Sequence, residues 1–400
     1  MAGSVKVLIT DGNTRPALAA TRSLAQKGYD VIIASDVPKT LAGVSKYCRD
    51  SFLYPAPNGR NREFIECIKK EIERRKIDIV IPITEVSAYL LLQERRALES
   101  VCHIPFPNAD VFDLVSDKIQ VAQLAQKLGL PIPRTVLVES AGELFKLIRD
   151  LYYPVVVKPS RSRILKRGRW VHGRVRYARD IEELKNIVEE ERALQDAPFM
   201  IQEFIEGEGR GVFTLYNQGK PLVFFSHRRI REKPPFGGVS VLCESVPLDT
   251  RMKDYAEKLL SKTNWHGVAM VEFKVCRRTG IPYLMEVNGR FWGSLHLAIQ
   301  AGIDFPHLLC QMALSRKLPT SFNYKSGIRS RWLLGDLDNL YLTLMSKEIG
   351  PYKIKYLDKV KRTIDFLNIF QKNTKYDIWD WRDPRPFWYE LTNYIRGTNA

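Results

Sequence analysis

The segment Val271–Gly293, Val-Glu-Phe-Lys-Val-Cys-Arg-Arg-Thr-Gly-Ile-Pro-Tyr-Leu-Met-Glu-Val-Asn-Gly-Arg-Phe-Trp-Gly, places two strand-type runs around an Arg-Arg-Thr-Gly turn. This pattern predicts an antiparallel hairpin. With the loop centred on Thr279, Glu272 lies directly opposite Glu286, about 5 Å away. Asn288 follows Glu286 by two residues and therefore shares its face. Two carboxylates and an amide oxygen on one sheet face predict a site for a hard cation such as Mg²⁺.

The residues next to this face extend the prediction. Arg290 follows at once and offers a planar donor suited to a phosphoryl oxygen. The alternative is that Glu272 and Glu286 lie on a solvated sheet face. Phe291 and Trp292 speak against it, because such apolar neighbours are not typical of a solvent-washed surface.

Length and composition bound the class of protein. A chain of 400 residues with 45% hydrophobic residues predicts roughly two or three globular domains. It has no apolar run long enough to span a bilayer, and its first residues lack a signal-peptide hydrophobic region. The six cysteines are scattered without a C-x-x-C pair. We therefore expect reduced thiols in a cytoplasmic protein, with attachment to the periphery of a membrane as an open alternative.

The net charge of +17 predicts an anionic partner, such as a nucleotide, a nucleic acid, an acidic polymer or a membrane surface. Much of the excess lies in residues 160–176, a basic, glycine-containing loop. It is interpreted either as a lid that closes over phosphates or as a flexible solvated loop.

Strand and helix patterns divide the chain into four parts. Residues 1–114 alternate strand and helix, which predicts a Rossmann-like parallel sheet, although the first turn lacks G-x-G-x-x-G. Residues 115–200 and 201–320 mix helices with strand runs of the α+β type, and residues 321–400 form a basic, aromatic extension. The fold class is thus α/β and α+β, with Glu85 at the end of a parallel strand, where such sheets bind ligands.

Dispersed polar groups follow in a characteristic order. Lys118 opens a helix, and Lys158 ends an apolar strand, where an ammonium costs several kcal/mol unless an anion neutralises it. The strand Met200–Phe204 then carries Gln202 and Glu203 before a glycine turn. After it, Arg228 and Arg231 precede a Pro-Pro-Phe-Gly237-Gly238 loop whose backbone can approach a ligand closely.

This order resembles the ATP-grasp superfamily, and within it the carboxylate–amine ligase branch with a pre-ATP-grasp domain. The resemblance covers about residues 4–320 and rests on Val-Val-Val-Lys158-Pro, Ile-Gln-Glu203-Phe-Ile-Glu-Gly and Leu-Met-Glu286-Val-Asn288-Gly-Arg290. It implies a two-subdomain grasp fold with ATP between the subdomains. It also implies ATP contacts by Lys118, Lys158, Gln202, Glu203, Phe204, Ile205 and Glu208, and metal ligation by Glu272, Glu286 and Asn288.

The same resemblance implies the reaction. A carboxylate attacks the γ-phosphate of ATP, and an amine then displaces phosphate from the acyl phosphate to form an amide. Two Mg²⁺ ions are expected, with Mn²⁺ as an alternative. The expected roles are transition-state stabilisation by Arg290, Arg228 and Arg231, and substrate contacts by Glu85, Gly237 and Gly238; His227 is expected to be structural.

Two alternatives stay open. One is an ATP-grasp carboxylase or phosphoryl-transfer enzyme, and the other is a non-catalytic module that binds anions or nucleic acid. Nucleic acid is the disfavoured partner, because no recognised nucleic-acid motif is present. The substrates, including an acidic or polymeric one, and a homodimer are also open. Residues 352–370 mix lysines with apolar residues in a helical pattern, which predicts either an amphipathic helix for a membrane face or partner, or a helix packed on the core.

Overall fold

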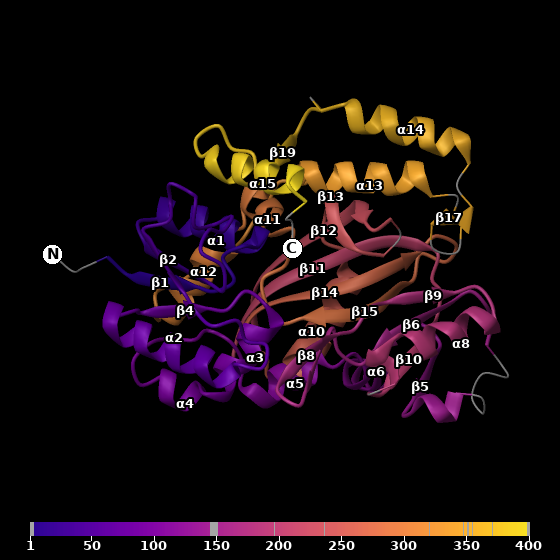
Figure 1. The fold of residues 1–400 in the computed structure, drawn as a ribbon, viewed down its shortest axis with the longest axis horizontal. Coiled ribbons are helices and arrows are strands. Elements are labelled where there is room, and N and C mark those ends of the chain that lie inside the picture. The colour runs from indigo at the N-terminus through magenta and orange to yellow at the C-terminus, as the bar shows by residue number, and fades with distance from the viewer. Residues whose placement is uncertain are drawn as a thin grey trace.

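The computed structural model describes residues 4–144, 151–195, 197–235, 237–319, 321–346, 348–349, 352–353, 355–369 and 371–397. The chain opens with a parallel sheet in the order β3-β2-β1-β4, shown in indigo in Figure 1. Val7, Leu8 and Ile9 of its central strand are completely buried, as expected for strands covered on both faces. The elements of this domain are β1 (Lys6–Ile9), α1 (Arg15–Gln26), β2 (Asp30–Ser35), β3 (Asp50–Leu53), α2 (Asn61–Arg75), β4 (Ile79–Ile81), α3 (Glu85–Gln93), α4 (Arg95–Leu98) and α5 (Ala109–Ser116).

A small antiparallel sheet in the order β5-β10-β6-β9 forms the second unit. A separate two-stranded hairpin, β7–β8, projects from it. The elements are α6 (Lys118–Lys127), β5 (Thr135–Val138), η1 (Ala141–Glu143), β6 (Val155–Pro159), β7 (Arg163–Lys166), β8 (Arg169–His172), β9 (Arg176–Ala178), α8 (Ile181–Glu190), α9 (Arg192–Gln195) and β10 (Phe199–Glu203).

The largest sheet has the order β15-β14-β11-β12-β13-β16-β19. Its long central strands cross the middle of the molecule in Figure 1. The elements up to the extension are β11 (Gly207–Asn217), β12 (Lys220–Lys233), β13 (Val239–Ser245), α10 (Thr250–Lys262), β14 (Gly267–Cys276), β15 (Pro282–Asn288), α11 (Leu295–Ala301) and α12 (Phe305–Ala313). The predicted fold class, a parallel-sheet domain followed by α+β units, is confirmed, and the sheets of these units are antiparallel up to the extension.

The C-terminal extension is built into the fold. Its first strand pairs with β13, and its last strand pairs in parallel with the first, so both lengthen the large sheet. Buried ion pairs between Arg15 and Asp377 (2.7 Å) and between Arg22 and Asp383 (2.9 Å) join the extension to α1. The elements are β16 (Arg329–Arg331), α13 (Leu333–Met345), β17 (Glu348–Ile349), β18 (Tyr352–Lys353), α14 (Tyr356–Leu367), β19 (Thr374–Tyr376) and α15 (Arg385–Ile395).

The buried side chains form two hydrophobic clusters in the described residues. One runs continuously from the parallel sheet into the large sheet. The other lies within the small antiparallel sheet and includes Val155, Val157 and Ile201. Because the small subdomain has its own core, it can move against the rest without opening the larger core.

No helix in the described part of the chain is long and apolar enough to cross a membrane.

Candidate active site

The predicted hairpin is present as β14 and β15, and Glu272 pairs directly with Glu286. The register shifts after Glu272, so that Phe273 pairs with Leu284 and Met285 forms a bulge. Asn288 donates from Nδ2 to Glu286 Oε1 at 3.1 Å. The predicted pairing of the two carboxylates is therefore confirmed, and the amide lies beside them as expected.

Each of these carboxylates has a cationic neighbour. Arg229 Nη2 lies 2.5 Å from Glu272 Oε2, and Lys118 Nζ lies 3.4 Å from Glu286 Oε2. Burial alone would raise the pKa of Glu286, but Lys118 and Lys158 outweigh it and bring the pKa down to about 2. For Glu272 burial prevails over Arg229 and raises the pKa.

The two lysines come from different parts of the fold, Lys158 from the small sheet and Lys118 from α6, which packs against β15. Lys118 is the first residue of α6 after the capping residue Asp117, and its Nζ also donates to Ser162 Oγ at 2.8 Å. Lys158 lies in β6, with Nζ 3.9 Å from the sulfur of Met285 and no ion pair to any described residue. Burial lowers the pKa of Lys158 to about 8, against the opposing charge of Glu286. This ammonium lacks a close anion, as expected for a group that meets a phosphate.

These groups open into one cavity of about 1510 Å³. The end of β10 and the residues after it supply one wall, with Gln202, Glu203, Phe204 and Ile205, which are expected to contact ATP. The carbonyl oxygen of the Gln202 side chain is buried without a partner among the described residues, although its Nε2 donates to Thr135 Oγ1. An N–H-bearing ligand edge would satisfy that oxygen.

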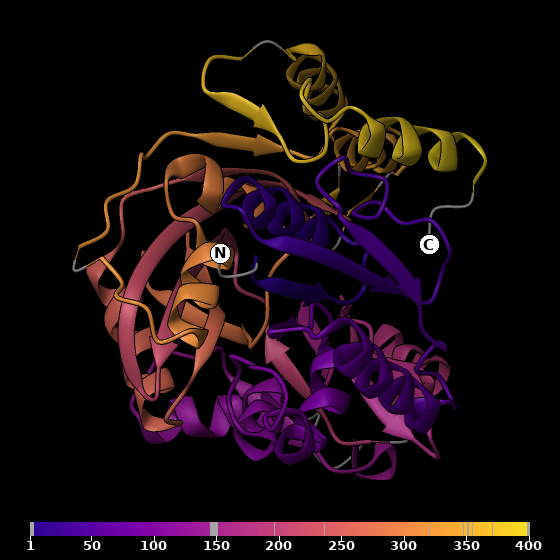
Figure 2. The ribbon, with the colours of Figure 1, turned by 90° about the vertical axis from the view of Figure 1, so that its left-hand side faces the viewer.

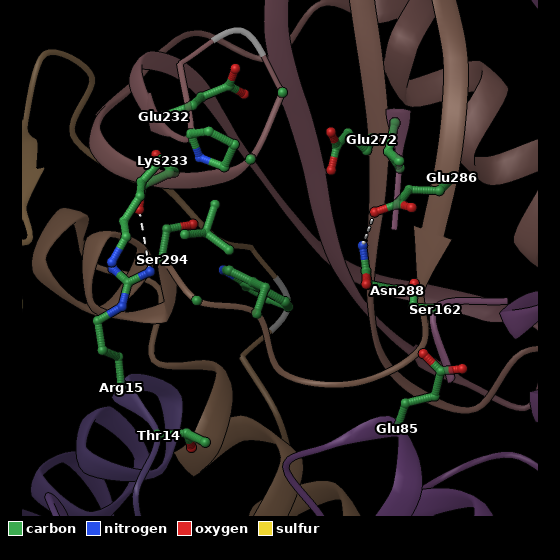
Figure 3. Close-up of a pocket in the computed structure, with 18 of the residues that line it drawn as sticks. Thr14, Arg15, Glu85, Ser162, Glu232, Lys233, Glu272, Glu286, Asn288 and Ser294 are labelled. Carbon is green, nitrogen blue, oxygen red and sulfur yellow. Dashed lines mark hydrogen bonds between the residues drawn. The ribbon is translucent and has the colours of Figure 1, made fainter. Parts of the chain in front are cut away.

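Figure 3 shows the two sides of this cavity. Glu85, Glu272, Glu286 and Asn288 lie on one side, and Thr14, Arg15 and Lys233 lie on the other. Glu85 is the first residue of α3, and burial raises its pKa against the nearby charges of Lys118 and Arg290.

The predicted loop glycines also line the cavity. A side chain at Gly237 would meet the Tyr177 hydroxyl at 2.0 Å, and one at Gly238 would meet the Lys233 carbonyl at 2.0 Å. Glycine is thus required for the close packing of this loop. Arg290 also lines the cavity, with Nη1 donating to the Phe291 carbonyl at 2.9 Å.

Three predicted residues lie outside this cavity. Arg228 pairs with Glu244 and, at 3.4 Å, with Glu208, the residue expected at the ribose. Arg231 is held by the buried Asp336. Arg229 lines the cavity in place of the predicted Arg228 and Arg231. Side chains alternate along β12, so Arg228 and Arg229 lie on opposite faces, and the pairing of β12 then shifts near Arg231. The place of Arg229 could not be counted from Glu272, because β12 and β14 are not adjacent strands.

His227 is fully buried and does not line the cavity. Its Nδ1 lies 3.4 Å from Ser294 Oγ, and its ring makes an edge contact with Phe213. Burial lowers its pKa well below the usual value. These surroundings agree with a structural role.

The basic segment 160–176 forms the β7–β8 hairpin, and its tip docks on the N-terminal domain. Gly168 O accepts hydrogen bonds from Gly59 N at 2.9 Å and Asn61 Nδ2 at 3.3 Å. Trp170 makes an edge contact with Tyr89. Arg163 and His172 line the cavity, so the hairpin forms part of its wall.

The extension supplies a wall that sequence reasoning missed. Trp332 stacks under Arg15, whose guanidinium carbon is 4.1 Å from the ring centroid, and donates to Glu390 at 2.6 Å. Burial raises the pKa of Glu390 to about 7, against the hydrogen bond from Trp332. The α15 residues lining the cavity are Tyr389, Glu390, Asn393 and Tyr394. Long-range pairing of β19 with β16 brings α15 here, and no local motif signals it.

The oxygen groups fit a Mg²⁺ ion that is completed by phosphate. No group of three or more His, Cys, Asp or Glu side chains that could hold a metal is present in the described residues. Protein ligation would thus be limited to the paired carboxylates, Glu272 and Glu286, with the amide of Asn288. Mg²⁺ commonly takes one or two carboxylates and fills its octahedron with water and substrate phosphate oxygens.

Comparison with known proteins shows what this chain resembles. Residues 195–335 match the family described as ATP-grasp in the biosynthetic pathway with Ter operon. In solved structures, L-amino acid ligase from Bacillus licheniformis superposes with a TM-score of 0.65 at 18% identity, covering 82% of this chain and 79% of that one. The chain is ATP-grasp-like in its matched region and in its fold.

Other ATP-grasp relatives differ in chemistry. The C-terminal section of the carbamoyl phosphate synthase large chain from Methanopyrus kandleri is 24% identical over 313 residues, 75% of this chain. The chain spans only 54% of that protein and 27% of the large chain from Archaeoglobus fulgidus. The biotin carboxylase domain of Hydrogenobacter thermophilus 2-oxoglutarate carboxylase, solved with MgADP, has a TM-score of 0.62 at 15% identity, covering 81% and 73%. The chain is thus similar to proteins named as ligases, synthases and carboxylases.

Proposed function

We propose that this protein is an ATP-grasp carboxylate–amine ligase that forms an amide and releases ADP and phosphate. The observation that carries the proposal is the meeting, in one cavity, of the Glu272–Glu286 pair with Lys118, Lys158 and Arg290. Such a set binds and neutralises a triphosphate, and phosphoryl transfer needs little more from a protein than positioning and charge.

In the proposed reaction an oxygen of the substrate carboxylate attacks the γ-phosphorus of ATP. The bond to the β–γ bridging oxygen breaks, giving an acyl phosphate and ADP. The nitrogen of a neutral amine then attacks the acyl carbon, the C–O bond to phosphate breaks, and a proton leaves the nitrogen as the amide forms.

The chain's own residues hold these groups. Lys118, Lys158 and Arg290 contact the phosphoryl oxygens, and Gln202 with the Glu203–Ile205 segment holds the adenine. Arg229 keeps Glu272 in place through its 2.5 Å contact. When bound by Glu272, Glu286 and Asn288, Mg²⁺ or Mn²⁺ would supply further charge neutralisation, and we propose two ions. The β7–β8 hairpin excludes water from the acyl phosphate.

The amine is assigned to the side of Arg15, Trp332 and Glu390. Arg15 is neutralised by Asp377, whereas Glu390 forms no ion pair with any described residue and has the Trp332 indole N–H as its hydrogen-bond donor. An amine bound as its ammonium form would give this half-buried carboxylate a charged partner, and transfer of its proton to the carboxylate would leave the neutral amine that attacks. We assign the substrate carboxylate to the opposite, cation-rich side of the cavity, where Arg290 lies.

We place the enzyme in the cytoplasm, where ATP is available. Its six cysteines are all free thiols in the structure, as this location requires. A homodimer is also part of the proposal, and light scattering of the purified protein tests it.

The test is an ADP-release screen with pools of carboxylic acids and amines, and mass spectrometry of the product. We expect ADP release only when an acid and an amine are both present, with a product one water lighter than their sum. Bicarbonate-dependent ADP release without an amine would instead favour a carboxylase, the chemistry of the biotin carboxylase relative. Salt-sensitive RNA binding without ATP turnover would favour a binding module.

A further inference from the structure

Helix α14 carries an apolar stripe that faces solvent. The stripe consists of Tyr356, Leu357, Val360, Ile364 and Leu367, which lie within about 100° of one another around the helix axis. Leu357, Ile364 and Leu367 are 76%, 63% and 67% exposed, and no described residue of α14 is buried. Tyr341, Leu344 and Met345 of the neighbouring α13 are exposed as well. Contiguous exposed apolar surface of this kind marks an interaction site.

The opposite face of α14 is polar and fixes the helix in place. Arg362 donates to Asp336 Oδ1 at 2.5 Å and to Asn339 Oδ1 at 2.7 Å, and Lys359 donates to the Leu344 carbonyl at 2.6 Å. Asp336 is completely buried. Turning the stripe inward would therefore break a buried ion pair, so the outward orientation is built into the fold. The sequence-based alternative of a helix packed on the core by its apolar face is wrong.

The charge around the stripe is one-sided. The acids of the extension point inward, where Asp336, Asp377 and Asp383 are buried against arginines. The exposed carboxylates in the described part of residues 321–400 are Glu348 and Asp358. The exposed cations there are Lys325, Lys355, Lys361, Lys372, Lys375, Arg382, Arg385 and Arg396. Inward pairing of acids thus leaves a basic surface.

Exposed aromatic side chains accompany these cations. Trp379, Trp381 and Trp388 are 41%, 75% and 56% exposed. Both views place α14 and the α15 segment at the same edge of the molecule, at the top of Figures 1 and 2. Apolar residues, tryptophans and lysines on one edge are the composition of a surface that inserts into a lipid interface.

We propose that this edge, with the α14 stripe at its centre, binds an anionic lipid bilayer and holds the protein at a membrane surface. Lipid accepts the apolar side chains in its acyl region while its headgroups neutralise the lysines. A second copy fits less well, because a two-fold contact would bring the same cations face to face. The inference does not depend on the proposed reaction.

The experiment is co-sedimentation of the full chain with vesicles of phosphatidylcholine alone or mixed with phosphatidylglycerol. We expect binding to the anionic vesicles that weakens with added salt. Lys361→Glu should reduce the partition coefficient at least about fivefold, as loss of one lysine near the surface does. Ile364→Glu should reduce it by an order of magnitude or more, because it places a charge in the apolar stripe.

The matched control is Leu53→Glu, which places the same charge at an exposed apolar residue on β3, outside the extension. It should bind as the wild type does. Since all three positions are exposed, folding should be little affected, which circular dichroism checks. Absence of binding, equal binding to neutral vesicles, or a dimer in solution that Ile364→Glu dissociates would each overturn the proposal.

Discussion

Glu272 and Glu286 face each other across β14 and β15, and each is held by a cation from a different element of the fold. Arg229 of β12 holds Glu272, and Lys118 at the start of α6 approaches Glu286. Helix α6 packs against β15, and its buried Val121 and Ala125 belong to the larger hydrophobic cluster, so both of these cations are anchored in the larger core. Movement of the small subdomain would shift Lys158 of β6 relative to Glu286 while leaving the Arg229–Glu272 pair intact.

Glu286→Gln should abolish the proposed metal-dependent chemistry. Removing the charge leaves the shape of the pair but weakens ligation of Mg²⁺, and we expect turnover to fall by about 10²-fold or more, with circular dichroism unchanged. Glu206→Gln is the control, because Glu206 is exposed and pairs at the surface with Arg277. ADP release measured with excess ATP decides the outcome, and undiminished turnover in the Glu286→Gln variant would refute the metal assignment.

Arg229→Gln and Arg228→Gln should behave differently although the residues are adjacent. Loss of Arg229 leaves Glu272 and Glu232 without their buried cation, which should destabilise the fold by about 3–5 kcal/mol and strongly reduce activity. Loss of the more exposed Arg228 should cost no more than about 1 kcal/mol and leave turnover near the wild-type value.

Urea unfolding and ADP release, both at a temperature where each variant is folded, measure these effects. Arg229→Lys separates charge from geometry, since lysine keeps the charge but cannot bridge two carboxylates in the same plane. Equal losses in the Arg228 and Arg229 variants would contradict the assignment of Arg229 to the cavity.

The hairpin was predictable from sequence because its information is local. Counting from Thr279 placed Glu272 opposite Glu286, and the pairing is as predicted. The pairing nearer the turn differs from the prediction, because Val275 pairs with Pro282. The bulge at Met285 then restores the predicted register at Glu272 and Glu286. The parallel sheet was predictable for the same reason, as its buried strands are continuous apolar runs.

Features fixed by distant contacts were not predictable. Two register shifts near Arg231 interrupt alternation in β12, and the cavity is lined by Arg229 and not by Arg228 or Arg231. The orientation of α14 depends on the Arg362–Asp336 pair, and α15 reaches the cavity through the pairing of β16 with β19. Neither relationship leaves a periodic signal in the chain.

Lys158→Met should separate nucleotide binding from stability. Replacing a buried ammonium that has no ion pair with any described residue should leave the melting temperature of the nucleotide-free protein unchanged or raise it. ATP binding should weaken by roughly 10- to 100-fold, the equivalent of about 1.5–3 kcal/mol for a charged hydrogen bond. Calorimetric titration with MgATP measures this loss, and Lys262→Met on the exposed end of α10 is the control. Unchanged affinity would remove Lys158 from the nucleotide site.

Glu390 should make stability depend on pH. Its pKa is raised from 4.5 to about 7 in the folded protein, so between these values the folded state holds more protons than the unfolded chain. Stability should therefore fall as pH rises through this window. Glu390→Gln keeps an acceptor for the Trp332 indole but cannot ionise, and its melting temperature relative to wild type should increase from about pH 5 to about pH 8.

The control is Glu66→Gln, since Glu66 lies on the surface of α2 beside Arg62. Its melting temperature relative to wild type should not increase between these pH values. A difference between Glu390→Gln and wild type that stays constant across the range would show that the Glu390 carboxyl titrates normally. A raised KM for the amine in the Glu390 variant, with the KM for ATP unchanged, would assign its carboxylate to the amine side of the cavity. Equal amine KM values would leave Trp332 as its partner and place the amine elsewhere.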